Sequence, residues 1–202
     1  MLDQNTLHSS AERLEAFWKK EASNYAQRTL PPNSKYREDW AKFLLKLNPK
    51  KVLEVGCNAG QNLLAIHRLA PDVKLYGCDI APMIGFTFGD EPIKFQVSSA
   101  YNLHYKSDFV DLVTTHGLLM HLPPESVGKA VCELIRVSSK HIVIREDVKI
   151  EGDGSYRGEP NAIFRHLYPS LFDYESVRLK EYSVEYIEGR QRATGIFEKS
   201  VS

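Results

Sequence analysis

A glycine-containing turn between an apolar run and a helical run restricts the fold of this chain more than any other feature. Residues 50–55, KKVLEV, lead directly into GCNAGQN, and apolar residues at helical spacing then continue to Leu69, just before Pro71. Strand-like and helix-like segments alternate from there onward, which is typical of an α/β sheet. We therefore expect a Rossmann-like, doubly wound sheet whose first strand ends at the glycine turn.

The remaining segments predict about seven strands, most of them parallel. Four further strand-like runs follow the first, at residues 74–80, 93–99, 109–116 and 140–147. A helix is expected over residues 124–137, because Pro124 suits a first helical turn and apolar residues recur at helical spacing. A shorter helix is expected around residues 163–172. Residues 179–187 and 192–200 alternate around a turn, which predicts an antiparallel hairpin that closes the sheet.

Two helices are expected before the sheet. Residues 10–28 carry apolar side chains at roughly helical spacing, and Ser9 or Ser10 is available as the N-cap. A second helix includes Trp40 and ends before Pro49.

Size and composition narrow the class of protein. A chain of 202 residues buries one sizeable core, so we expect one domain over residues 1–202, with residues 1–48 covering the ligand site and residues 49–202 forming the sheet. The 26 basic and 26 acidic residues balance, so the chain lacks the positive field that nucleic-acid binders use. No apolar run approaches the ~20 residues that span a bilayer, and no secretory signal is recognised. We expect a cytoplasmic protein that binds neither nucleic acid nor a membrane.

The three cysteines, Cys57, Cys78 and Cys132, show no C-x-x-C spacing. This spacing argues against a structural zinc site and against a disulfide framework. We expect three reduced thiols in or near the core, and no bound metal.

Gly56, Gly60 and Asp79 together indicate a ligand that contains a nucleoside. Gly56 ends the first strand and Gly60 opens the helix, so the backbone can turn sharply and approach a ligand closely. Asp79 ends the second strand, 23 residues after Gly56 (79 minus 56), where such folds place an acid that accepts both ribose hydroxyls. A lone glycine turn is more often plain turn chemistry. The coincidence of glycine turn and acid, each at the carboxyl end of a strand, favours a nucleoside cofactor.

An acid, a glycine turn and a helix follow one another in this loop, as in the first motif of the class I S-adenosylmethionine-dependent methyltransferases, which the chain resembles. The acid is Glu54, and the G-x-x-x-G that follows does not fit the G-x-G-x-x-G of dinucleotide sites. Residues 98–124 resemble the family's segment through strand four and the loop after it. Ser99 and Ala100 stand where the family carries an acid and a small residue that meet the adenine. The resemblance implies S-adenosylmethionine as the cofactor and the following cofactor-binding residues: Tyr25, Arg28, Glu54, Gly56, Cys57, Asn58, Gly60, Asn62, Asp79, Ile80, Ser99, Ala100, His116 and Gly117.

Three patches, FWKKEASNYAQRT, GCNAGQNL and SYRGEPNAIFRH, carry a narrower resemblance. They are similar to the methylases associated with pseudaminic acid biosynthesis, a group linked to bacterial surface-sugar pathways. Asn58 and Asn62 fit this group better than the broad family, which usually has glycine at position 58. In similar enzymes a Tyr and an Arg of the N-terminal helix reach the methionine carboxylate, and Tyr25 with Arg28 matches that placement. The alternative is that these two residues belong to an ordinary amphipathic helix.

Methyl transfer to an acceptor needs positioning first and, for a hydroxyl acceptor, a base. His121, in the loop after the fourth strand, is the candidate catalytic base. The alternative is that His121 caps this loop or packs against the adenine. His116 and Gly117 are expected to line the cofactor pocket.

The polar segment after the fifth strand is expected to recognise the acceptor, because it lies on the same edge of the sheet. Arg157 and Arg165 suit a bidentate clamp on a carboxylate, although solvated arginines are the simpler alternative. The expected substrate-binding residues are Glu146, Tyr156, Arg157, Arg165 and His166.

We expect an enzyme that methylates a small polar metabolite, such as a sugar or an anionic sugar acid, at oxygen or nitrogen. An RNA or protein methyltransferase is an alternative that the neutral charge disfavours. The sequence is also compatible with a cofactor-binding scaffold without chemistry and with a dehydrogenase. It leaves the acceptor, the methylated atom and the oligomeric state open.

Overall fold

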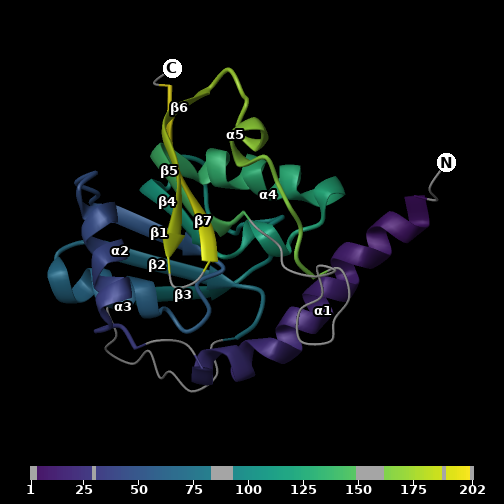
Figure 1. Cartoon of the computed structure of the whole chain (residues 1–202), viewed down its shortest axis with the longest axis horizontal. Helices are drawn as coiled ribbons and strands as arrows, with labels where there is room; N and C mark the ends of the chain where they lie inside the picture. The colour runs from purple at the N-terminus through teal and green to yellow at the C-terminus, as the bar shows by residue number, and fades with distance from the viewer. Residues whose placement is uncertain (1–3, 29–30, 83–92, 149–161, 188–189, 201–202) are drawn as a thin grey trace.

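A computed structural model of the chain shows one seven-stranded sheet with helices on both faces (Figure 1). It describes residues 4–28, 31–82, 93–148, 162–187 and 190–200, and the side chains of these except residues 4–10, 23, 25–28 and 187. The strands are β1 (Lys51–Val55), β2 (Lys74–Asp79), β3 (Ile93–Val97), β4 (Val110–His116), β5 (Ser138–Asp147), β6 (Val177–Ile187) and β7 (Arg190–Lys199). The helices are α1 (Gln4–Arg28), α2 (Lys35–Leu45), α3 (Gln61–Leu69), α4 (Pro124–Val137) and α5 (Tyr168–Leu171), with a 3-10 turn η1 (Leu119–His121).

The strands lie in the order β3-β2-β1-β4-β5-β7-β6. The pairs among β1 to β5 are parallel, whereas β7 runs antiparallel to both β5 and β6. This arrangement confirms the expected Rossmann-like sheet with an antiparallel hairpin at its end. The carboxyl ends of β1, β2 and β4 therefore meet at one edge, where open α/β sheets bind their ligands.

Alternation along the strands gives the sheet an apolar layer on each face. Val52 of β1 packs with Trp40 and Leu63 in the layer under α2 and α3, while Leu53 packs with Val131 under α4. This two-sided burial is why the parallel strands are nearly continuous runs of apolar residues.

The helix boundaries differ from the expected ones in two helices and agree in a third. The helix α1 begins at Gln4, so neither Ser9 nor Ser10 is its N-cap; no Gly or Pro in residues 4–10 interrupts a helix there. The helix α5 has only four residues. The expected helix does not extend over residues 163–167, because that segment runs beside η1, where the Phe164 amide donates to the Met120 carbonyl at 2.7 Å. The helix α4 has the expected bounds.

Two of the three cysteines are buried as expected, and the third is not. Cys57 and Cys78 are buried, whereas Cys132 is exposed. The apolar stripe of α4 runs through Val127, Val131 and Leu134, so position 132 falls on the solvent side of the helix.

Helix α1 lies outside the two helical layers, and its N-terminal end points away from the rest of the molecule (Figure 1). No helix in the described part of the chain is long and apolar enough to cross a membrane.

Candidate functional site

A pocket lies at the carboxyl edge of the sheet, between the strand ends and one stripe of α1. The stripe contains Ala11, Leu14, Glu15, Trp18 and Ala22. These positions recur every three or four residues, so they share one face of the helix. The other lining residues come from the strand ends and the loops after them: Val55, Gly56, Asn58, Asp79, Ile80, Ser98, Ser99, Ala100, Tyr101, His116, Gly117, Leu118, His121 and Leu122.

The turn after β1 has three residues with left-handed backbone: Gly56 (φ +73°), Asn58 (φ +45°) and Gly60 (φ +66°). A Cβ atom on Gly56 would lie 2.9 Å from Cδ1 and 3.1 Å from Cβ of Leu118, so the backbone conformation and crowding by Leu118 both disfavour a side chain here. Asn is one of the few other residues that tolerate this conformation.

Asn58 uses its side chain to connect the turn with α1. Its Oδ1 accepts from the Ala59 amide at 2.7 Å, and its Nδ2 donates to the Ala22 carbonyl at 3.2 Å. A glycine at this position would lack both contacts.

Asp79 is fixed by two backbone amides, one from the turn after β1 and one from the loop after β2. Its Oδ2 accepts from the Asn58 amide at 2.8 Å, and its Oδ1 accepts from the Ala81 amide at 3.2 Å. Burial raises the pKa of this carboxyl, and the bonds from the backbone amides oppose that rise. Because each carboxylate oxygen can accept more than one hydrogen bond, Asp79 can still receive two hydroxyl donors from a ligand.

Ser99 is joined by Glu15 of α1 at the place where the adenine is expected. Its hydroxyl donates to Oε1 of Glu15 at 2.7 Å and accepts from the Tyr101 amide at 3.2 Å. Helix α1 thus delivers a carboxylate to the place where the resembled family carries an acid in the loop itself.

His121 forms one wall of the pocket beside Trp18, with ring centroids 4.3 Å apart. Its Nδ1 lies 2.7 Å from the Ala162 carbonyl, which can only accept, so the proton is on Nδ1 and Nε2 is the basic nitrogen. Burial lowers the pKa of His121 to about 4. The side chain is therefore neutral at physiological pH, in the form that a base requires but with low basicity.

We predict that this histidine makes stability depend on pH. The pKa of His121 falls from 6.5 to about 4 on folding, so the unfolded chain binds a proton that the folded chain does not. The free energy of unfolding should therefore decrease as the pH falls from about 6.5 toward about 4. Glu54 and Glu146, whose pKa values burial raises to about 7, act with the opposite sign, since their folded forms hold the extra proton.

The difference in the free energy of unfolding between the wild type and His121→Asn reports on His121 alone, because Glu54 and Glu146 contribute equally to both proteins. Urea denaturation at about pH 7 and about pH 5 should show that the wild-type advantage shrinks at the lower pH. A difference that does not change with pH would contradict a neutral, buried His121.

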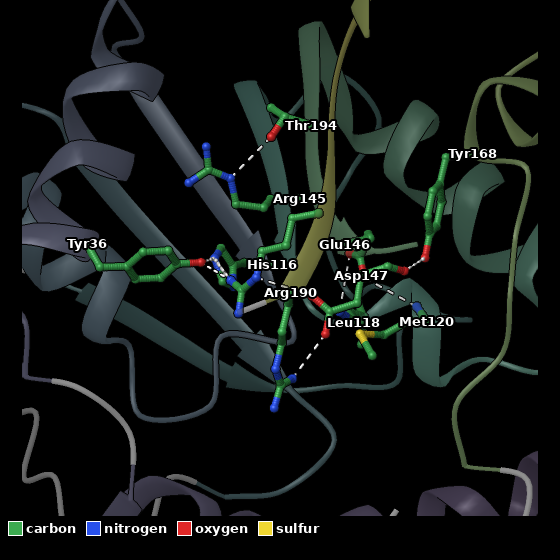
Figure 2. Close-up of polar contacts among 11 residues, drawn as sticks. Tyr36, His116, Leu118, Met120, Arg145, Glu146, Asp147, Tyr168, Arg190 and Thr194 are labelled. Atoms are coloured by element: carbon green, nitrogen blue, oxygen red, sulfur yellow. Dashed lines mark hydrogen bonds and ion pairs between the residues drawn. The ribbon is translucent and has the colours of Figure 1, made fainter. Parts of the chain in front are cut away.

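A polar cluster continues from the pocket wall on the α2 side (Figure 2). The Tyr36 hydroxyl lies 2.6 Å from Nε2 of His116, and Nη1 of Arg192 donates to that hydroxyl. Since Tyr36 accepts from the arginine, it donates to the imidazole. Burial, followed by the charges of Arg192 and Arg145, lowers the pKa of His116 well below its ordinary value.

Several of the expected cofactor-binding residues lie behind the turn and not in the pocket wall. Glu54 is 1% exposed, and its Oε1 accepts from Nδ2 of Asn62 at 2.5 Å. Asn62 accepts in turn from Nη1 of Arg37, so these three side chains form a buried chain under the turn. Cys57 is buried, and Gly60 opens α3. The other expected residues with described side chains, Gly56, Asn58, Asp79, Ile80, Ser99, Ala100, His116 and Gly117, all line the pocket.

Glu146 supports the loop after β4, and its carboxylate lies next to Leu118 and Met120 (Figure 2). It is 1% exposed and accepts from the Thr115 hydroxyl at 2.8 Å and from the amides of Leu118 and Met120 at 3.3 Å each. Because its side chain is buried and is not among the residues that line the pocket, Glu146 holds the pocket wall from behind.

The other expected acceptor residues are not brought together in the described part of the chain. Arg165 is exposed, and His166 is partly buried with Nε2 3.0 Å from the Leu122 carbonyl. Tyr156 and Arg157 lie outside the described residues, as do the side chains of Tyr25 and Arg28.

Five residues that the sequence did not single out belong to the site or its border: Glu15, Trp18, Tyr36, Arg145 and Arg192. The helical spacing of Leu14 and Trp18 in the sequence could have predicted that Glu15 and Trp18 face the site. The residues that could ligate a metal form no cluster of three among the described side chains.

Residues 52–141 match the family model described as a methyltransferase domain. This segment contains the turn after β1, Asp79 and the loop after β4. An uncharacterized protein of Haemophilus influenzae is 28% identical to this chain over 118 residues, which are 52% of the chain. The match spans only 45% of that relative's length.

Solved structures share the fold at low sequence identity. The 1,6-didemethyltoxoflavin-N1-methyltransferase of Burkholderia thailandensis, solved with S-adenosylhomocysteine, is 13% identical with a TM-score of 0.72, over 96% of this chain and 90% of that chain. Magnesium protoporphyrin IX methyltransferase of Synechocystis PCC 6803, solved with S-adenosylmethionine, is 13% identical with a TM-score of 0.69, over 99% of each chain. The [4+2]-cyclase SpnF is 13% identical with a TM-score of 0.63, over 82% of this chain and 81% of that chain.

Residues 52–141 therefore match a methyltransferase domain, and the chain shares the fold of solved methyltransferases that hold S-adenosylmethionine or S-adenosylhomocysteine. This supports the prediction of an enzyme that uses S-adenosylmethionine. The fold also serves a cyclase, so it does not fix the reaction by itself. The narrower resemblance to the methylases associated with pseudaminic acid biosynthesis stays a prediction.

Proposed function

We propose that this protein transfers a methyl group from S-adenosylmethionine to oxygen or nitrogen of a small polar metabolite. The observation that carries the proposal is the Asp79 carboxylate, held by two backbone amides at the pocket wall beside a turn that leaves no room for a side chain at Gly56. A fixed carboxylate with remaining acceptor capacity suits a ribose with two neighbouring hydroxyls.

The pocket residues fit the parts of an adenosine in order. Asp79 would hold the ribose, and the closely approached backbone at Gly56 would lie along the cofactor. Ser99 and Ala100 would border the adenine, and Glu15, which the Ser99 hydroxyl orients, would accept from its amino group. When bound, S-adenosylmethionine supplies an electrophilic methyl group on a sulfonium.

The protein's own part in the reaction is to orient the acceptor and to exclude water. Leu14 and Trp18 place apolar surface over the pocket, and Leu14 is 2% exposed. His121, which carries its proton on Nδ1, would accept a hydrogen bond or a proton from the acceptor through Nε2. Since its pKa is about 4, positioning contributes more than proton removal in this scheme.

We propose that the acceptor is a sugar or sugar acid, because three sequence patches resemble methylases linked to surface-sugar pathways. Tyr156, Arg157, Arg165 and His166 remain proposed contacts of that acceptor. We further propose one domain over residues 1–202, with residues 1–48 covering the cofactor, and a cytoplasmic location. A methyltransferase of RNA or protein and a scaffold without chemistry are the competing functions.

Thermal denaturation with added ligands tests the cofactor. S-adenosylmethionine and S-adenosylhomocysteine at a hundred times the Kd should stabilise the fold by about 2.7 kcal/mol, a rise in Tm of about 5–10 °C, and NAD should not. A rise with NAD alone would identify a dehydrogenase.

A labelled methyl group then separates the candidate acceptors. Nucleotide-activated sugars and nonulosonic acids should become labelled, and tRNA and unfolded protein should not. Label that enters only tRNA would contradict a small-metabolite acceptor, and binding without transfer to any acceptor would favour the scaffold.

A further inference from the structure

The register of the sheet places a row of polar side chains on the face that α2 covers. His116 of β4 pairs with Arg145 of β5, and Arg145 pairs with Thr194 of β7. Paired residues on neighbouring strands point to the same face. Val143 and Ile196, two positions away on these strands, belong to the apolar layer under α2, which identifies the face.

The row carries two guanidinium groups whose charges act on His116, those of Arg192 and Arg145; Figure 2 shows Arg145 beside Thr194. Arg145 donates from Nε to Oγ1 of Thr194 at 3.2 Å and stacks over the Trp40 ring at 4.2 Å. Arg192 lies with Nη1 3.5 Å from Nε2 of His116 and bonds the Tyr36 hydroxyl. Packing and hydrogen bonds therefore hold both forks in place.

Positive charge exceeds negative charge in this row. Asp147 is the one carboxylate that the described part of the chain brings within ion-pair distance of Arg145 or Arg192; it lies 3.2 Å from Nε of Arg192 and is shared with Arg190. Arg145 is 9% exposed and has no carboxylate partner within that same part. Glu185, opposite Arg192 in β6, is exposed. A buried guanidinium is costly when no carboxylate lies at ion-pair distance, which holds for Arg145 among the described residues, so a bound anion would stabilise it.

The row continues the pocket on the side away from the cofactor's ribose. His116 belongs both to the pocket wall and to the row. Asp79 is on β2, and the order β2-β1-β4-β5-β7 puts three strand spacings, about 14 Å, between β2 and β5. A group bound at Arg145 and Arg192 therefore lies beyond the end of β4, where an acceptor would approach.

We propose that Arg145 and Arg192, whose guanidinium groups are held by Trp40, Thr194 and Tyr36, form an oxyanion subsite that binds the carboxylate or phosphate of the acceptor. The inference rests on the proposed methyl transfer and deepens it by naming an anionic acceptor. The planar fork of arginine matches both oxyanions in a bidentate way. The neutral His116 adds no competing charge, and it connects the subsite with the pocket, because it lines the pocket and lies 3.5 Å from Nη1 of Arg192.

The test uses inorganic phosphate as the probe and compares matched arginine variants by calorimetry at constant ionic strength. Arg192→Gln removes one fork. Arg145→Lys keeps the charge but loses the fork, so it reports on the subsite if the first variant folds poorly. Arg178→Gln removes an exposed arginine of β6 that pairs with Glu198, and it serves as the control.

Phosphate should bind the wild type and Arg178→Gln alike, and about tenfold to a hundredfold more weakly to Arg192→Gln and Arg145→Lys. The affinity for S-adenosylhomocysteine should change by less than about twofold in all three variants. Equal phosphate binding by Arg192→Gln and Arg178→Gln would mean an adventitious ion only and would overturn the proposal, as would no binding by the wild type.

A second outcome separates the acceptor from the cofactor as the source of the anion. Phosphate could compete with S-adenosylhomocysteine, and Arg192→Gln could lose affinity for S-adenosylhomocysteine. In that case the arginines hold the cofactor's own carboxylate, and the acceptor subsite is refuted. If the wild type binds phosphate but not S-adenosylhomocysteine, the proposed function fails while the anion site stands.

Discussion

Replacing Asp79 by Ala is expected to weaken the binding of S-adenosylhomocysteine by roughly two to three orders of magnitude. Without the carboxylate, the ribose of the bound cofactor would lose the two charge-assisted hydrogen bonds that we propose. The amides of Asn58 and Ala81, which now donate to Asp79 at 2.8 Å and 3.2 Å, would also lose their acceptor. Titration calorimetry on the folded variant measures the effect directly.

Two further variants make this result interpretable. Asp79→Asn keeps one carbonyl oxygen for the amides, so it should fold better than Asp79→Ala and still bind the cofactor poorly. Asp72→Ala removes an exposed carboxylate from the turn before β2 and should leave the affinity unchanged. An Asp79→Ala protein with wild-type affinity would remove the central support for the cofactor site.

Replacing Gly56 by Ala is expected to reduce the free energy of unfolding by about 2–4 kcal/mol. The backbone at Gly56 has φ +73°, and the added Cβ would lie 2.9 Å from Cδ1 of Leu118. Relief of this clash would move the loop after β4, so the cofactor affinity should fall as well. Urea denaturation and calorimetry measure the two effects.

Gly128→Ala is the matched control for this substitution. Gly128 lies inside α4, and a Cβ there meets no atom within 4 Å. Alanine should therefore stabilise the helix by about 0.5–1 kcal/mol, the opposite sign to that expected at Gly56. If both variants were equally stable, the strained turn would not be a requirement of the fold.

The parts of the site that could be predicted are those whose geometry is local. Gly56 and Asp79 each end an apolar strand, and a strand end followed by a turn is encoded by neighbouring residues. The strands were expected to be parallel, so both residues were placed at one edge of the sheet. The observed strand pairs confirm that placement.

Glu146 shows where local reasoning fails. Its position at the carboxyl end of a predicted strand, residues 140–147, suggested that it meets the acceptor. In the folded chain the 3-10 turn η1 folds over it, and its oxygens accept from Thr115 and from the amides of Leu118 and Met120. Spacing along the chain gave no sign of this, because these partners belong to another strand and its loop.

The sequence by itself determined the fold class, the glycine turn and the acid at the end of the second strand, since periodicity and turn chemistry act over a few residues. Only the tertiary structure decided which distant residues meet at the site. Glu15 and Ser99 are 84 positions apart, and Tyr36 and Arg192 are 156 apart. The physical reason is that alternation along a strand sets the face of a side chain, while strand order and register set its neighbours.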